Sequence, residues 1–193
     1  MNHKLLTAIT LTLLLTACDR QAARMTEAAE KCVEAMRIGA DEIAEELCTM
    51  ALGDNDGADL KPEIRSQRLY RLGHIKRTLA KYPEAQGLIA QSLEIEETLS
   101  DSENLARGHS LLEMSLIMAA LGQWEQGATF LERALPFAGQ FSEEEQASMA
   151  NILRHYAGQL EKLQQTELAS RFRAAHDGLT EGKQSTPAPF EAY

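Results

Sequence analysis

The stretch "GQWEQGATFLERAL" at residues 122–135 decides the fold, because the chain contains two more segments of the same pattern. These are "AKYPEAQGLIAQSL" at residues 80–93 and "GADEIAEELCTMAL" at residues 39–52. The segments begin at residues 39, 80 and 122, so they are 41 and 42 residues apart. In each, two small residues stand seven positions apart and a leucine follows. A period of 20 to 50 residues is typical of proteins built from stacked repeats.

The composition predicts that these repeats are helical. Alanine, leucine, glutamate and glutamine are abundant, whereas proline and β-branched residues are sparse. Large apolar residues recur at helical spacing, as expected for core positions. They are Leu69, Leu72, Leu111, Met114, Leu153 and Tyr156. We therefore expect an all-α protein.

The repeat resembles the tetratricopeptide repeat (TPR), in the form of about 42 residues that is known from kinesin light chains. "LGQWEQGATFLERAL" is the closest match, and Leu72-Gly73 matches the Leu-Gly pair of the family. A weaker fourth copy runs from about Asn151 to His176, with Ala169 in the column of small residues. The resemblance implies a TPR-like α-solenoid of about four helix hairpins over residues 26–176.

Small residues are expected where the two helices of a hairpin approach most closely. The pairs predicted from the register are Cys32 with Ala44, Gly73 with Ala85, Ser115 with Gly127, and Ala157 with Ala169.

Breaks between hairpins are predicted at residues 53–59, 99–104 and 139–145, where turn-forming residues gather. Ser142, followed by three glutamates, has the pattern of a helix N-cap with an acidic first turn. Gly178 is expected to stop the last helix, so that residues 177–193 form a flexible tail.

The N-terminus has the pattern of a signal peptide. An apolar run of eleven residues, Leu5 to Leu15, follows a short polar start that contains Lys4. Leu15-Thr16-Ala17-Cys18 resembles the lipobox of bacterial lipoproteins. The resemblance implies a signal peptide at residues 1–17, a lipidated Cys18, and a short tether at residues 18–25. Asp19 resembles a retention signal, which favours the inner membrane over the outer, with the domain on the periplasmic side.

The other two cysteines, Cys32 and Cys48, lie symmetrically about the turn predicted at Gly39-Ala40. Antiparallel packing would bring them together, and the periplasm is oxidising. We therefore predict a Cys32–Cys48 disulfide, with two reduced thiols in a tight helix contact as the alternative.

Charge is segregated along the second repeat. Residues 61–81 contain seven basic residues and one acid, and residues 84–103 contain six acids and no base. In TPR domains the inner face of each first helix commonly holds an extended peptide. The matching positions predict a groove that would grip an acidic or carboxylate-bearing partner. They are Tyr70, His74, Arg77, His109, Leu112, Leu116 and Arg154. The alternative is an ordinary charged helix face.

The sequence offers no catalytic motif, no metal-binding motif and no cofactor motif. His74, His109 and His155 stand on different repeats and form no HExxH pattern. A net charge of −10 argues against binding to nucleic acid. The leading hypothesis is therefore a non-enzymatic, membrane-anchored adapter or scaffold that binds an envelope protein or peptide. The alternative is a module that senses a small ligand or a cell-wall fragment.

Overall fold

The computed structural model describes the backbone at residues 3–99 and 105–181, and within these ranges the side chains other than those of residues 3–19, 55 and 56. The α-helices are α1 (His3–Arg37), α2 (Asp41–Leu52), α3 (Pro62–Thr78), α4 (Tyr82–Thr98), α5 (Leu105–Ala120), α6 (Trp124–Ala134), α7 (Glu143–Lys162) and α8 (Thr166–Thr180). Two 3-10 helices, η1 (Asp54–Gly57) and η2 (Leu135–Gln140), complete the described part, which contains no strand. The expected all-α class is confirmed.

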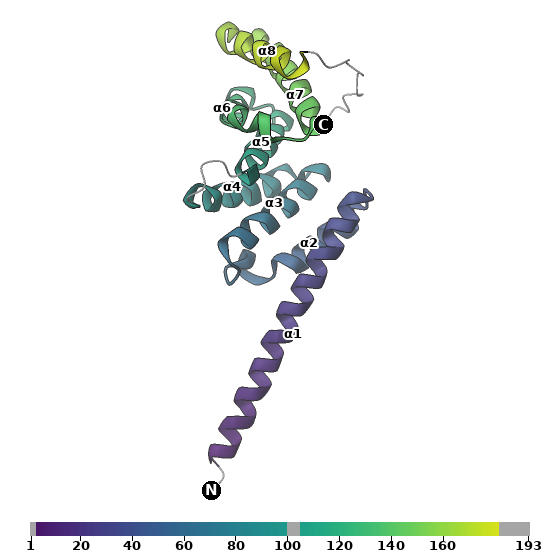
Figure 1. Cartoon of the computed structure of the whole chain (residues 1–193), viewed down its shortest axis with the longest axis vertical. Helices are drawn as coiled ribbons and strands as arrows, with labels where there is room; N and C mark the ends of the chain where they lie inside the picture. Colours follow the sequence, from purple (N-terminus) through teal and green to yellow (C-terminus); the bar gives the residue numbers. More distant parts are fainter. Residues whose placement is uncertain (1–2, 100–104, 182–193) are drawn as a thin grey trace.

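The helices form four antiparallel hairpins that stack one on the next (Figure 1). α1 pairs with α2, α3 with α4, α5 with α6, and α7 with α8. Contacts from α2 to α3 and from α4 to α5 join consecutive hairpins. The predicted solenoid of four hairpins is thereby confirmed.

The four hairpin turns share one backbone geometry. In each, one residue has a positive φ of 56° to 73°, and these residues recur at intervals of 41, 42 and 42. They are Gly39, Ala80, Gly122 and Gln164. At each turn the N–H of this residue and the N–H of the next donate to carbonyls at the end of the first helix. The fourth repeat therefore has the same turn as the others, although its sequence matches least.

Glycine at the two turns that lack it should stabilise the protein. Ala80 (φ 56°) and Gln164 (φ 62°) are exposed and adopt the left-handed conformation, which disfavours residues with a Cβ. We expect Ala80→Gly and Gln164→Gly each to raise the free energy of unfolding by roughly 0.5 to 1 kcal/mol in urea titrations.

The matched control is Gly122→Ala, because a Cβ at Gly122 (φ 73°) would meet no atom within 4 Å. It should cost about 1 kcal/mol through backbone strain alone. The shared turn would be refuted if Gly122→Ala left the free energy of unfolding unchanged while Ala80→Gly and Gln164→Gly lowered it.

The core explains why some repeat positions are small. All eight residues of the predicted pairs are buried. A Cβ on Gly73 would lie 2.6 Å from Cδ1 of Ile89, and one on Gly127 would lie 1.9 Å from Oη of Tyr156. A larger residue at either glycine would therefore collide with a large side chain, which explains why these two positions are small.

Helix boundaries mostly follow the predicted breaks. Ser142 is the N-cap of α7, as the sequence predicted, and in the structure it forms a capping box with Glu145. α8, however, continues through Gly178 to Thr180, four residues beyond the predicted end of the repeat domain. Leu179 packs against the core, which offsets the low helix propensity of glycine. Residues 182–193 of the predicted tail, and 100–104 of the second break, lie outside the described residues.

α1 is continuous from His3 to Arg37, so it includes residues 3–17 of the predicted signal peptide and the whole of the predicted tether at residues 18–25. A Cβ added at Gly53, the residue after α2, would lie 2.7 Å from Cε of Met25, so α1 already lies against the end of α2 at Met25. No helix in the described ranges combines the length and the apolar character needed to cross a membrane.

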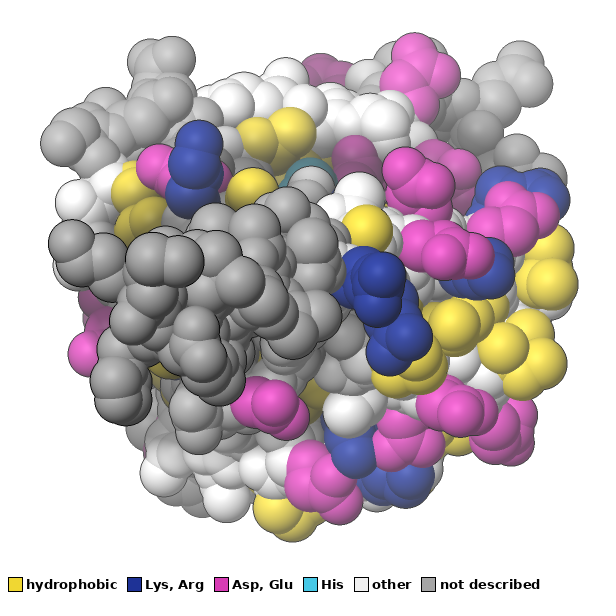
Figure 2. Space-filling model, turned by 90° about the horizontal axis from the view of Figure 1, so that it is seen from below, with side chains coloured by type: hydrophobic (Ala, Val, Ile, Leu, Met, Phe, Trp, Pro, Cys, Tyr) yellow, Lys and Arg dark blue, Asp and Glu magenta, His cyan; other side chains and the backbone are white. Residues whose placement is uncertain are grey.

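Figure 2 views the molecule from the end of the first hairpin, where acidic and basic side chains are interspersed with hydrophobic ones. On this hairpin Ile38, Ile43 and Met50 are each more than half exposed.

Candidate binding face

The structure places the predicted groove residues on the first helices of consecutive hairpins. We call the following residues the first-helix face: Tyr70 and His74 on α3, His109, Leu112 and Leu116 on α5, and Arg154 on α7. Arg154 is exposed, and the other five side chains are half-buried.

Ring contacts hold the aromatic part of this face together. The ring centroid of Tyr70 lies 6.3 Å from that of His74 and 6.3 Å from that of His109. The ring of His109 stacks on Phe141, with centroids 5.1 Å apart. Phe141 comes from the segment after η2, and no feature of the sequence pattern indicated this contact. The α3 and α5 parts of the face are thus fixed relative to each other.

Arg77, in contrast, was wrongly assigned to the groove. Its side chain is only 4% exposed, and its Nε lies 2.5 Å from Oε1 of Glu113 on α5. Oε2 of the same carboxylate lies 3.2 Å from Nδ1 of His74. Arg77 therefore joins α3 to α5 and is not placed to grip a partner.

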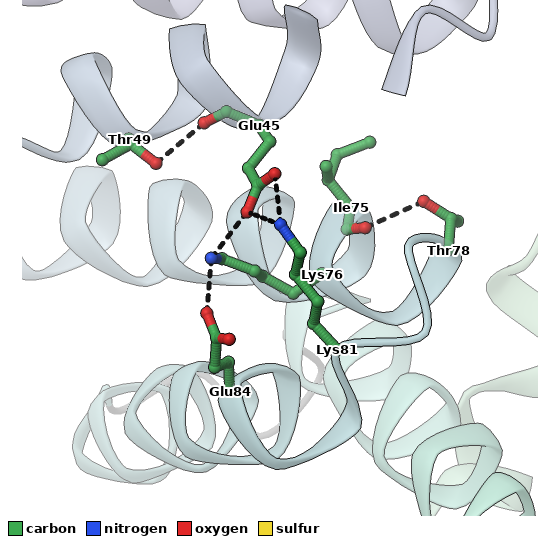
Figure 3. Close-up of polar contacts among 7 residues, drawn as sticks. All are labelled: Glu45, Thr49, Ile75, Lys76, Thr78, Lys81 and Glu84. Carbon is green, nitrogen blue, oxygen red and sulfur yellow. Dashed lines mark hydrogen bonds and ion pairs between the residues drawn. The ribbon is translucent and has the colours of Figure 1, made fainter. Parts of the chain in front are cut away.

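Contacts between helices also explain why basic and acidic residues are segregated along the second repeat. Figure 3 shows Glu45 of α2 between Lys76 of α3 and Lys81 of the following turn, with Glu84 of α4 on the other side of Lys76. Arg68 is buried and donates to the carbonyl of Ala51. Much of the basic segment thus stabilises the packing of hairpins, so it does not by itself indicate an acidic partner.

Several polar side-chain contacts link one hairpin to the next at the same sequence separation. The pairs Glu45–Lys81, Arg77–Glu113, Glu97–Arg133 and His109–Glu145 are each 36 residues apart. The exposed pairs contribute little free energy, because water screens them. The buried contact of Arg77 with Glu113 is the one that we expect to matter most.

The electrostatics of the face follow from burial and these pairs. Burial alone would raise the pKa of Glu113, but the charges of His74 and Arg77 and their hydrogen bonds lower it to about 2. Burial, with the nearby charge of Glu113, raises the pKa of Tyr70 above its ordinary value, so its phenol stays neutral. Near pH 7 the carboxylate of Glu113 therefore stays charged and the phenol of Tyr70 stays neutral.

A hollow of about 410 Å³ lies at the α7 end of the first-helix face. We call it the α7 hollow; its lining residues are Asn151, Arg154, His155, Gly158, Gln159 and Lys162. Only Arg154 of these was predicted as a site residue. Asn151 and Gly158 could have been found, since they stand 42 residues after His109 and Leu116.

The predicted cysteine pair is brought together across the first hairpin. The Cα atoms of Cys32 and Cys48 are 5.1 Å apart, and their sulfur atoms lie at bonding distance. Both residues are 1% exposed. The side chain of Cys18 is outside the described residues.

A thiol count checks the disulfide. Denatured, unreduced protein should contain no titratable thiol from Cys32 or Cys48. Two titratable thiols would contradict the disulfide. Because the bond joins residues separated by 16 positions, Cys48→Ser should cost about 3 kcal/mol of stability relative to the oxidised protein.

Among the residues that the structure describes, no group of three or more His, Cys, Asp or Glu side chains is arranged to hold a metal ion.

Comparison with solved structures shows the fold. The chain is similar to the crystal structure of a Podosopora anserina protein described as a kinesin light chain with nearly identical TPR-like repeats. The TM-score is 0.60 at 18% identity, over 83% of this chain and 77% of that one. A single-substitution variant of those repeats gives a TM-score of 0.58 at 22% identity, over 80% and 75%. No model of a known protein family and no curated protein sequence matches the chain. The chain thus has a TPR-like fold.

Proposed function

We propose that this chain is a non-enzymatic adapter, anchored to the periplasmic side of the inner membrane, that binds an envelope protein through its first-helix face. The TPR-like fold supports the general part of this proposal, because stacked helical hairpins typically serve as protein-binding surfaces. A fold alone names no partner, so the argument must come from the face itself.

The observation that carries the proposal is the repetition of accessible side chains on α3 and α5. Tyr70 and Leu112 occupy equivalent positions 42 residues apart, and so do His74 and Leu116. All four are half-buried, so each offers part of an aromatic or apolar surface while its base is held in place. Such rigid, partly exposed rings and leucines favour binding of another chain, because little side-chain entropy is lost.

The anchor is supported by the sequence at the N-terminus. An apolar run and the lipobox-like Leu15-Thr16-Ala17-Cys18 precede the domain directly. Two or more acyl chains on Cys18 would bind a membrane stably without a spanning helix. Asp19 favours retention at the inner membrane over transfer to the outer one.

Metabolic labelling tests this anchor. Cells that express the full chain are given radiolabelled palmitate, and the protein is recovered from sucrose-gradient fractions of the envelope. We expect label on the wild type in the inner-membrane fraction and none on Cys18→Ser. An unlabelled wild type would contradict lipidation, and labelled protein in outer-membrane fractions would contradict the inner-membrane assignment.

Co-purification tests the face. A protein that co-purifies with the wild type from detergent-solubilised membranes should be lost with the double variant Leu112→Gln, Leu116→Gln. Ile43→Gln is the matched control, since Ile43 is an exposed apolar residue on a second helix. Binding through the first-helix face would be contradicted if Ile43→Gln also lost the co-purifying protein, or if the double variant retained it.

The second candidate is a sensor of a small ligand or a cell-wall fragment. The α7 hollow is the part of the first-helix face where such a ligand would be sought; it is an open surface, since all six lining residues come from α7. A thermal shift with protein-free cell-wall extract would support the sensor, since a ligand of the native state raises its apparent stability. The adapter proposal expects no shift.

A further inference from the structure

A carboxyl group lies buried at the joint between the second and third hairpins. It belongs to Glu96 on α4, which is 0% exposed. Its Oε1 lies 3.1 Å from Oγ of Ser92 on the same helix and 3.2 Å from Oγ of Ser110 on α5. Oγ of Ser92 also lies 2.9 Å from the carbonyl oxygen of Ser66 on α3. This cluster of polar groups thus links three helices of two hairpins.

The carboxyl group of Glu96 contacts hydroxyl groups and forms no ion pair with the residues that the structure describes. Its Oε2 is buried and has no hydrogen-bond partner among them. Arg107 of α5 approaches α4 here, but its Nη2 donates to the backbone carbonyl of Glu96, at 2.5 Å. Glu113, which is buried at the same joint, instead pairs with Arg77 and His74. The joint therefore contains one buried carboxyl group with cationic partners and one without.

The hydrogen bonds of the cluster depend on whether Glu96 carries a proton. An ionised carboxylate only accepts, so the single hydroxyl hydrogen of Ser92 is shared between Oε1 and the carbonyl of Ser66. A neutral carboxyl group can donate to Oγ of Ser92, which leaves the Ser92 hydrogen for Ser66. Ser110 can still donate to the carboxyl oxygen. Proton uptake therefore completes a chain of hydrogen bonds from α5 through α4 to α3.

Burial favours the neutral form of this carboxyl group. It raises the pKa of Glu96 above 4.5, and the charge of Glu97 adds to the rise, whereas the hydroxyl groups of Ser110 and Ser92 and the charge of Arg107 oppose it. Because the folded protein then binds the proton more tightly than the unfolded chain, stability rises as the pH falls through the raised pKa. The gain is complete below about 4.5, the ordinary value. This dependence is opposite in sign to that of an ion-paired carboxylate.

The cluster adjoins the first-helix face on both sides of the joint. Ser66 stands four positions before Tyr70 on α3, and Ser110 stands two positions before Leu112 on α5. The charge of Glu96 is also among those that raise the pKa of Tyr70. A change in how α4 holds α5 would therefore change the spacing between Tyr70 and Leu112.

We propose that Glu96 makes this joint sensitive to pH: proton uptake tightens the second hairpin against the third, and proton loss loosens them. A partner that spans Tyr70 and Leu112 is then held more tightly at about pH 5 than at about pH 8. This consequence for binding rests on the proposed adapter function, whereas the change in the joint does not.

Hydrogen–deuterium exchange, read by mass spectrometry, tests the joint in the full lipidated chain in detergent. Exchange is measured at a series of pH values from about 5 to about 8 and corrected for the intrinsic effect of pH on amide exchange. We expect the protection of α4 and α5 to rise severalfold more than that of α7 and α8 as the pH falls. A rise no larger than that of α7 and α8 would overturn the proposal.

Two glutamine variants assign the response. Glu96→Gln keeps the shape of the side chain but has no titrating proton, so α4 and α5 should lose their additional rise. Glu97→Gln is the matched control, because Glu97 is the next residue, is half exposed and pairs with Arg133, and it should respond as the wild type does. An undiminished rise in Glu96→Gln would overturn the assignment and leave His74 and His109 as its source, since histidine changes charge in this range.

Ser110→Ala separates this role from a merely structural one. The Ser110 hydroxyl donates to the carboxylate, so its removal should disfavour the ionised form and move the change in protection to higher pH. A structural role alone would lower protection equally at every pH, and that result would contradict the proposal. This variant retains the carboxyl group, so it tests the proposal even if Glu96→Gln does not fold.

Co-purification at about pH 5 and about pH 8 tests the consequence for binding. The protein that co-purifies through Leu112 and Leu116 should be retained severalfold better at the lower pH, and Glu96→Gln should remove the difference. Equal retention while the joint responds would overturn the link to binding and leave the pH-sensitive joint standing. A joint that does not respond, with co-purification intact, would overturn the proposal and leave the adapter function standing. A responsive joint without any co-purifying protein would identify the adapter function as the wrong part.

Discussion

Replacing Glu113 by alanine is expected to lower the free energy of unfolding by about 3 to 5 kcal/mol. The carboxylate is buried and accepts from both Arg77 and His74, so its removal leaves the guanidinium of Arg77 buried without this counter-charge. Urea titration monitored by circular dichroism measures the loss. The double variant Arg77→Met, Glu113→Leu should recover much of it, because a buried ion pair replaced by apolar residues often costs little.

The same pair makes stability depend on pH. The pKa of Glu113 is lowered from 4.5 to about 2 in the folded protein. Between these values the unfolded chain binds the proton more readily, so stability is lost as the pH falls from about 4.5 to about 2. The lowered pKa corresponds to about 3 kcal/mol. The difference in stability between wild type and Glu113→Gln should shrink over this range. A constant difference would contradict the ion pair.

Gly127→Ala is expected to cost about 3 kcal/mol, the second large effect. The new Cβ would lie 1.9 Å from Oη of Tyr156 and 2.9 Å from Cβ of Met118. The Tyr156 hydroxyl is itself fixed, because it donates to the carbonyl of Ser115 at 2.5 Å. Thermal or urea unfolding of the purified variant gives the cost.

A double-mutant cycle with Tyr156→Phe identifies the clash. Alone, Tyr156→Phe removes a buried hydrogen bond and should cost about 1 kcal/mol. In the Gly127→Ala background it removes the clashing hydroxyl and should stabilise the protein instead. Additive effects would show that Tyr156 is not what requires glycine at position 127.

Repeat organisation could be predicted from the sequence because it is periodic. The small residues and the turns recur every 41 or 42 residues, and both the hairpins and the N-cap at Ser142 were confirmed. The end of α8 was not predictable from Gly178 alone, because the helix continues where Leu179 can pack against the core.

The candidate site was predictable only in part, since a pattern locates a position but not its partner. Register placed Tyr70, Leu112 and Leu116 correctly on the first helices. The register could not show that Arg77 pairs with Glu113, 36 residues away. Nor could it show that the ring of Phe141 stacks on that of His109. The α7 hollow was missed although the register could have located it, since all its lining residues come from one helix, and Asn151 and Gly158 stand 42 residues after His109 and Leu116.

Photo-crosslinking in cells tests the central claim, that the first-helix face binds a protein partner. A photoreactive phenylalanine replaces Tyr70, Leu116 or the control Ile43 in the full lipidated chain, and adducts are identified by mass spectrometry. We predict one dominant envelope protein from both Tyr70 and Leu116, and not from Ile43. Absence of a protein adduct from both face positions in a folded protein, or the same adduct from Ile43, would contradict the claim.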